Sequence, residues 1–232
     1  MTVRKPPRAN TPAANPPAAA AAPADADKAL RGDAGRPVKR DARGTTIRIR
    51  AAARRLFLER GYGNTSMDAV AAAAPVSKRT LYQHYPSKAD LFGAVISEVW
   101  SHFTSGPILP ETTQEDPRQV LRTFVARLCT HWEQPDVIPI LRLIIAEAPR
   151  FPELSDALAR TSKEPTLRSL TAYLERLRAA GQLPGDCDTG LAATQFLGAI
   201  KEPLFWPRVL GGPIAFSVSA VTDRAIADIL RT

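Results

Sequence analysis

Residues 77–84, SKRTLYQH, bring basic, amide and hydroxyl side chains together within about two helical turns. Lys78 and Arg79 can donate hydrogen bonds to guanine, and Gln83 can pair with adenine. The methyl group of Thr80 can pack against thymine. In a helix that enters the DNA major groove, residues near the N-terminus reach the base edges. The chemistry that this segment favours is the reading of base pairs in double-stranded DNA.

Further polar side chains around this segment are suited to phosphate, because phosphate contacts fix register without reading sequence. We expect such contacts from Ser66, Tyr82, His84 and Lys88, and Ser77 completes the predicted DNA-binding set. The alternative is that these are ordinary solvated side chains of an exposed helix.

The spacing of apolar residues predicts the helices that must position this chemistry. Residues 49–57 place their apolar side chains on one helical face, and Gly61 follows as a stop signal. A second, short helix is expected to begin at Thr65, whose hydroxyl and the Asp68 carboxylate would form a capping box.

The third helix is expected to start at Ser77, with Val76 and Leu81 forming a hydrophobic staple. Leu81 and Tyr85 lie four residues apart and should share its buried face, which leaves Tyr82 on the other side. Residues 87–90 repeat the capping pattern and open a fourth helix. Two short helices joined by a tight turn indicate a helix-turn-helix.

Beyond residue 106 the sequence contains helical periodicity and no strand alternation, so the predicted fold class is all-α. We expect helices after Asp116, around residues 140–146, from Pro152 to about residue 180, and over about 189–202 and 214–230. Pro165, Pro203 and Pro207 should mark breaks or kinks.

The formal net charge of +8 is concentrated in the first part of the chain. Residues 1–90 hold 17 Lys and Arg against 7 Asp and Glu, and residues 91–232 hold 14 against 16. This asymmetry favours an anion-binding module followed by a module with another task. Residues 1–44, rich in Ala and Pro, are predicted to form a disordered basic arm, either passive or tracking DNA.

Other classes of function find little support in the sequence. Two cysteines and three scattered histidines provide no disulfide framework and no predicted metal site. We find no nucleophile elbow, HExxH, P-loop or GxGxxG motif, so we expect neither an enzyme nor a cofactor. No apolar run is long enough to span a membrane, and a cytoplasmic location is expected.

The sequence from residue 49 to residue 92 resembles, without a gap, the TetR (tetracycline-repressor-like) family of bacterial regulators. The pattern is carried by Ile49, Ala52, Ala53, Leu56, Phe57, Gly61, Tyr62, Thr65, Ser66, Met67, Val70, Ala71, Val76, Ser77, Thr80, Leu81, Tyr82, His84, Tyr85, Ser87, Lys88, Leu91 and Phe92. In addition, residues 141–154, LRLIIAEAPRFPEL, look like the AefR-like branch of C-terminal domains.

The resemblance implies a homodimer whose N-terminal helices bind a palindromic operator and whose C-terminal helices hold a small-molecule effector. We therefore expect an arm at 1–44, a DNA-binding domain at 45–92 and an effector and dimerisation domain at 93–232, with the dimer formed through the last two helices. Pro75 departs from the family, which usually has glycine there. Since proline disfavours helical geometry at the preceding residue, we expect an extended Ala74.

Residues of the effector pocket are harder to assign, because a pocket depends on which side chains converge. Aromatic residues such as these are more often core residues than pocket walls, and Arg142 and Glu147 could form a buried pair, a surface pair or ligand contacts. The predicted pocket set is Trp132, Arg142, Glu147, Tyr173 and Phe196.

Two functions therefore compete on the sequence. The first is a sequence-specific, ligand-responsive transcriptional regulator, which in families that this sequence resembles is most often a repressor. The second is a non-specific, nucleoid-associated DNA binder that uses the basic part alone, which leaves the neutral remainder of the chain without a role.

Overall fold

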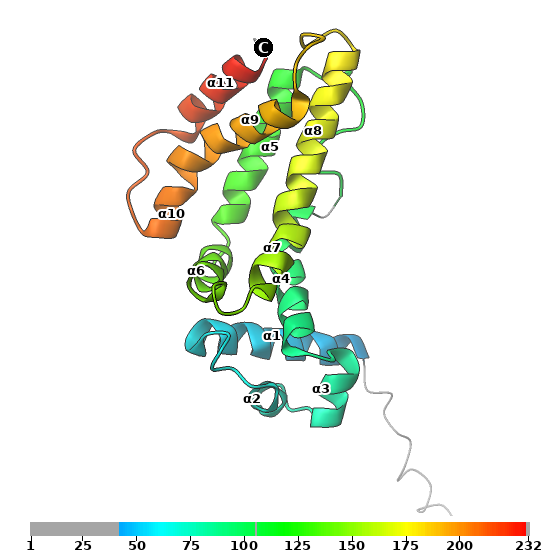
Figure 1. The fold of residues 1–232 in the computed structure, drawn as a ribbon, viewed down its shortest axis with the longest axis vertical. Coiled ribbons are helices and arrows are strands. Elements are labelled where there is room, and N and C mark those ends of the chain that lie inside the picture. Colours follow the sequence, from blue (N-terminus) through cyan, green and yellow to red (C-terminus); the bar gives the residue numbers. More distant parts are fainter. Residues whose placement is uncertain (1–41, 105, 231–232) are drawn as a thin grey trace, which may run out of the picture. The chain divides into compact units, whose positions relative to one another are not determined.

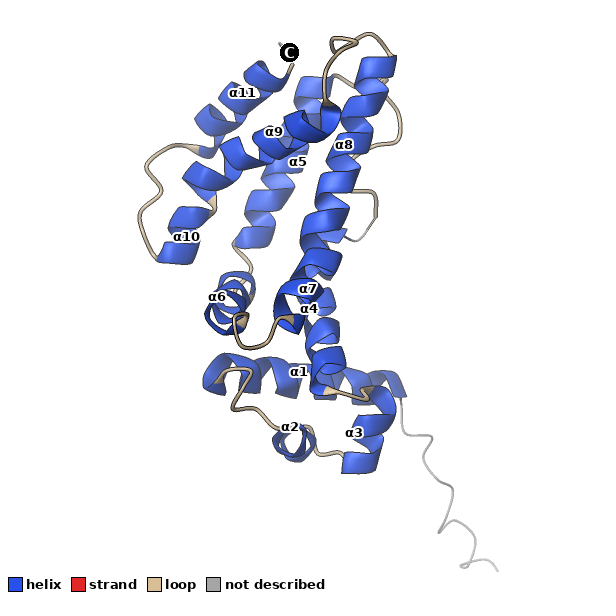
Figure 2. Ribbon diagram, viewed as in Figure 1, coloured by secondary structure: helices blue, strands red, loops and turns tan. Residues whose placement is uncertain are grey.

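The computed structural model describes residues 42–104 and 106–230, and every regular element in these two ranges is a helix (Figures 1 and 2). The predicted all-α fold class is confirmed. Most of the predicted arm lies outside the described residues. The first helix begins at Ala42, so residues 42–44 are helical although we had placed them in the arm.

The first four helices are α1 (Ala42–Arg60), α2 (Met67–Ala73), α3 (Lys78–His84) and α4 (Lys88–Thr104). They enclose a core in which Phe57, Tyr62 and Phe92 pack as a ring cluster, with centroids 5.3–5.5 Å apart. Leu81 of α3 is fully buried in this core. Burial of apolar area of this kind is what holds the two short helices, which would not be stable alone.

The predicted caps of α3 and α4 are present. The Ser77 Oγ accepts from the Thr80 amide at 3.0 Å. Ser87 and Asp90 form a reciprocal capping box, since the Asp90 amide donates to the Ser87 Oγ and the Ser87 amide to the Asp90 carboxylate, each at 3.1 Å. These bonds satisfy amides that a helix start leaves without a partner.

The predicted cap of α2 was wrong by one residue. Ser66 is the N-cap, and its Oγ accepts from the Ala69 amide at 3.1 Å. The Thr65 hydroxyl is buried and instead donates to the carbonyl oxygens of Leu56 and Gly61, at 3.2 and 2.8 Å. Thr65 therefore satisfies carbonyls at the end of α1, which also need partners.

The turn between α2 and α3 also differs from the prediction. Ala74 has φ −92° and ψ 9°, which is not extended, and Pro75 has a φ of 26°. A positive φ is natural for glycine and strained for proline. The turn is held by the Ala74 amide bonded to the Val70 carbonyl and the Val76 amide bonded to the Ala71 carbonyl. The turn thus keeps a non-extended Ala74 before Pro75, which differs from the predicted extended Ala74.

The remaining helices are α5 (Pro117–Trp132), α6 (Val137–Glu147), α7 (Glu153–Leu158), a π-helical turn η1 (Ala159–Lys163), α8 (Glu164–Ala179), α9 (Thr189–Leu204), α10 (Trp206–Leu210) and α11 (Val218–Ile229). The turn η1 ends two residues before Pro165, which lies in the first turn of α8 and cannot donate an amide hydrogen bond. Pro203 lies in the last turn of α9, which ends one residue later at Leu204. Phe205 separates α9 from α10, and Pro207 lies in the first turn of α10, where proline is accepted.

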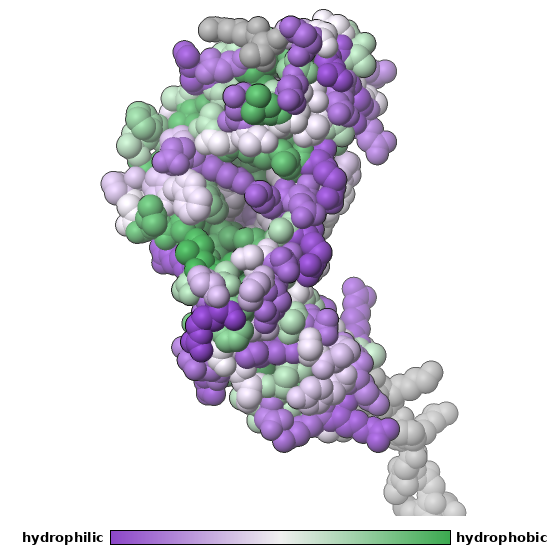
Figure 3. Space-filling model, in the orientation of Figure 1, coloured by the Kyte–Doolittle hydropathy of each residue, from purple (hydrophilic) through white to green (hydrophobic). Residues whose placement is uncertain are grey.

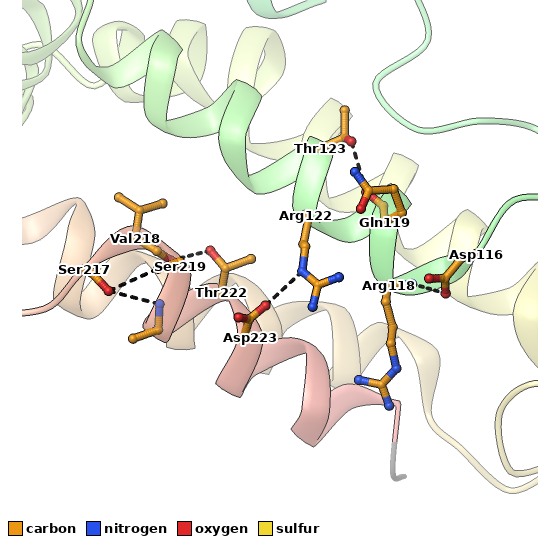
Figure 4. A network of polar contacts seen from close by, with 11 residues as sticks. Asp116, Arg118, Gln119, Arg122, Thr123, Ser217, Val218, Ser219, Thr222 and Asp223 are labelled. Carbon is orange, nitrogen blue, oxygen red and sulfur yellow. Dashed lines mark hydrogen bonds and ion pairs between the residues drawn. The ribbon is translucent and has the colours of Figure 1, made fainter.

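The last helix is shorter than predicted, because it begins after Ser217, whose Oγ accepts from the Ala220 amide at 3.2 Å. Figure 4 shows how α11 is attached to α5 through the ion pair of Asp223 with Arg122, 2.9 Å apart. On its buried side α11 contributes Thr222, Ala225, Ile226 and Ile229. The helix is therefore part of the core that α9 and α5 form.

Within the described ranges, none of the helices combines the length and the apolar character that crossing a membrane requires.

Candidate nucleic-acid interface

Helix α3 presents its polar side to solvent. Leu81 and Tyr85 are buried, as predicted, whereas Tyr82 on the opposite side is 48% exposed. The exposed residues of this side include Lys78, Arg79, Tyr82, Gln83 and His84, and Thr80 is half-buried. Figure 3 shows mainly hydrophilic surface over α2 and α3. Two buried anchors thus leave an array of donors and acceptors facing outward.

The two serines of the predicted set lie at the starts of the two short helices. Ser66 caps α2 and Ser77 caps α3, and both are exposed. The Ser77 Oγ also lies 2.7 Å from the Thr80 Oγ1. The exposed first turns of both helices leave backbone amides that favour an anion. Such positions suit contacts to phosphate.

Lys78 is held by Asp68, for which the sequence predicts only a capping role. Its Nζ lies 2.6 Å from the Asp68 carboxylate on α2, and both side chains are more than half exposed. The hydrogen bond to Asp68 raises the pKa of Lys78, so the side chain stays protonated. To reach a base or a phosphate, this ammonium must leave Asp68.

Lys88 does not lie where we expected a phosphate donor. Its Nζ donates to the Tyr62 carbonyl at 2.8 Å and lies 4.3 Å from the centre of the Tyr62 ring. Burial lowers the pKa of Lys88, an effect that Glu147 and Glu153 oppose. The ammonium therefore faces the loop between α1 and α2 rather than the exposed side of α3.

Each of the five residues of the predicted effector pocket has partners of its own in the structure. Trp132 packs on the Phe205 ring at 5.1 Å, and Tyr173 is fully buried. Arg142 donates to the carbonyls of Val209 and Arg208, at 2.7 and 3.0 Å, which ties α6 to α10. The structure thus uses these three residues for packing and for joining helices.

The other two also have neighbours of their own. Phe196 is buried and lines a hollow of about 230 Å³ between α9 and α11. Glu147 accepts from the amides of Tyr62 and Gly63, each at 2.7 Å. The sequence left three roles open for Glu147, and none of them included this contact with the backbone of the loop between α1 and α2.

The fold and the exposed α3 define a helix-turn-helix protein with a second helical module. Residues 49–95 match the family described as "Bacterial regulatory proteins, tetR family", and residues 119–232 match the "AefR-like transcriptional repressor, C-terminal domain". Both matches agree with the resemblance found from residues alone.

Similar proteins support the same assignment. The solved structure of the flavonoid-responsive regulator FrrA is 32% identical, with a TM-score of 0.71, over 81% of this chain and 95% of that one. The DNA-binding transcriptional repressor TetR of Mycobacteroides abscessus is 28% identical over 82% of this chain and 94% of its own length. The transcriptional activator FasR of Mycolicibacterium smegmatis is 42% identical over 74 residues, which cover 32% of this chain and only 34% of FasR. The chain belongs to the TetR family of DNA-binding transcriptional regulators.

The Asp68–Lys78 pair generates a prediction about DNA affinity. Asp68→Asn releases Lys78, so affinity for double-stranded DNA at low salt should rise by about two- to fivefold, the range of exposed ion pairs. Fluorescence anisotropy with a labelled duplex measures the change. In a Lys78→Ala background the same substitution should have little effect.

The matched control is Glu59→Gln, which removes an exposed carboxylate paired with Arg55 on α1. An equal rise in both variants would show that general charge, and not the release of Lys78, sets the affinity.

Proposed function

We propose that this protein is a ligand-responsive repressor that binds a palindromic operator as a homodimer. The observation that carries the proposal is the outward polar side of α3, anchored from behind by Leu81 and Tyr85. Arg79 and Gln83 are the exposed residues with the donor geometry that guanine and adenine require. A second, non-specific function would need no such arrangement of base-reading side chains.

The division of labour on the operator follows from position. Lys78, Arg79, Thr80 and Gln83 read bases, and phosphates are contacted by Ser66, Ser77, Tyr82 and His84. In a symmetric dimer, two copies of α3 must lie about 34–36 Å apart to enter successive major grooves. A ligand that changes the angle between protomers changes this spacing, and so changes affinity without touching DNA.

The dimer is proposed to form through α9, α11 and the loop between α10 and α11. Large apolar side chains are exposed on these elements and at the end of α10, and an exposed patch of this kind marks an association surface. They are Leu191, Leu210, Ile214, Phe216 and Val218, exposed by 36–80%. Phe216 and Val221 also line a hollow of about 310 Å³ against α9 that a second copy can fill. Figure 3 shows hydrophobic surface in the region of α10 and this loop.

Repression and ligand response are supported by similar proteins of comparable length. FrrA is described as flavonoid-responsive, and the similar M. abscessus protein is a repressor. A small-molecule effector that acts in the cytoplasm, where the bacterial chromosome lies, fits the descriptions of both proteins. The chemical nature of the effector does not follow from these names.

The test of operator recognition is to select fragments of the organism's genomic DNA with the purified protein. The wild-type chain should enrich palindromic sites. Arg79→Ala should lose base preference at particular positions of each half-site, at a cost of about 1–3 kcal/mol there. Equal binding of all fragments by the wild-type protein at near-cellular salt would favour the non-specific function.

The test of the dimer surface is Phe216→Asp. Phe216 is 62% exposed, so a charge there costs little folding stability but opposes burial against a second copy. Sedimentation should show monomers at concentrations where the wild-type chain is dimeric. Ile145→Asp, a change at a 55% exposed residue of α6, is the matched control and should leave the dimer intact. Dimers of the Phe216 variant would remove this loop from the interface.

A further inference from the structure

Tyr62, in the loop between α1 and α2, is bonded through its amide, its carbonyl and its side chain. Its amide donates to the Glu147 Oε1 at 2.7 Å, and its carbonyl accepts from the Lys88 Nζ at 2.8 Å. Its hydroxyl donates to the Glu153 Oε1 at 3.1 Å, and its ring lies edge-on to Phe151 at 5.1 Å. We call these five residues, Tyr62, Lys88, Glu147, Phe151 and Glu153, the Tyr62 junction.

The junction joins two different groups of helices. Tyr62 lies in the loop between α1 and α2, and Lys88 is the first residue of α4. Glu147 ends α6, and Glu153 begins α7. Any displacement of the α6–α7 segment must therefore act on the loop that leads from α1 into the helix-turn-helix.

The glycines beside Tyr62 make this close contact possible. A Cβ atom on Gly61, which has a φ of 84°, would lie 2.4 Å from the Glu147 Oε1. A Cβ atom on Gly63 would lie 3.1 Å from the Phe151 ring. Because no side chain intervenes, the Glu147 carboxylate reaches two successive backbone amides, those of Tyr62 and Gly63.

The chemistry of the contact makes it specific to charge. A carboxylate that accepts two amide hydrogen bonds forms charge-assisted bonds, which are stronger than neutral ones. An amide side chain of the same shape offers only one acceptor oxygen. The ammonium of Lys88 lies over the ring of Tyr62, where the cation–π attraction adds to the hydrogen bond. Loss of either charge should loosen the same loop.

We propose that Glu147 and Lys88 are positioning residues that set operator affinity by holding the Gly61–Gly63 loop, and with it the helix-turn-helix, in one orientation relative to α6 and α7. This inference rests on the proposed function. Two recognition helices must meet two grooves at once, so a module that is free to rotate loses more conformational freedom on binding. A loosened junction therefore weakens DNA binding although neither residue contacts DNA.

The experiment compares Glu147→Gln, Lys88→Gln and the double variant in the full-length protein, on a duplex that the wild-type chain selects from a random pool. Each single change should weaken binding about tenfold, within the ~5–150-fold range usual for coupling between sites. The double variant should bind about as weakly as either single variant, because both changes release one loop. Thermal unfolding establishes that each variant is folded at the temperature of the binding assay.

The salt dependence separates positioning from phosphate contact. The slope of log affinity against log salt should stay at the wild-type value in Lys88→Gln, whereas loss of a phosphate contact lowers it by about one. The matched control is Glu133→Gln, which neutralises an exposed carboxylate paired with Arg208 at 3.1 Å, and it should bind as the wild-type chain does.

Two results would overturn the inference: wild-type affinity in folded Glu147→Gln, or a slope lowered by about one in Lys88→Gln. Failure of the proposed function looks different, since the wild-type chain would then enrich no sequence. The variants would in that case be compared on an arbitrary duplex, where the same weakening and the same slopes are expected. Absence of all duplex binding by the wild-type chain would contradict both proposals.

Discussion

Burial of Leu81 and Tyr85 is the constraint on which the account of this protein depends. These two side chains anchor the seven-residue helix α3 in the core, and they leave its other side in water. A helix of this length has no stability of its own, so its orientation is set entirely by packing. The apolar core behind α3 thus determines which polar side chains are available to DNA.

The same core also carries the connection to the rest of the chain. Tyr62 packs with Phe57 and Phe92 on one side and with Phe151 on another, so one ring belongs to both groups of helices. Burial and the Glu153 carboxylate raise the pKa of Tyr62, which keeps its hydroxyl protonated and able to donate. The same cluster of rings therefore packs behind α3 and contacts the C-terminal helices.

Local features of the sequence predicted most of the DNA-binding part. The caps at Ser77 and Asp90, and the buried pair Leu81 and Tyr85, follow from contacts three or four residues apart, which periodicity and capping rules describe. Thr65 was misassigned because its buried hydroxyl bonds to carbonyls at the end of the preceding helix. Pro75 adopts a φ that propensity alone argues against.

Contacts between distant residues could not be predicted in this way. Lys88 lies 26 residues from Tyr62, and Glu147 lies 85 residues from it. Nothing in the spacing of charges shows that these two side chains meet one loop, although the glycines around Tyr62 mark a place of close approach. For the same reason the sequence did not show that Arg142 joins α6 to α10.

The most direct measurement concerns where α3 lies on DNA. A chelated iron attached through Arg79→Cys, in a chain whose two native cysteines are replaced by serine, cleaves the DNA nearest to the start of this helix. The account predicts two cleavage centres in a selected site, related by symmetry and about one helical turn apart. Diffuse cleavage, or a single centre, would contradict it.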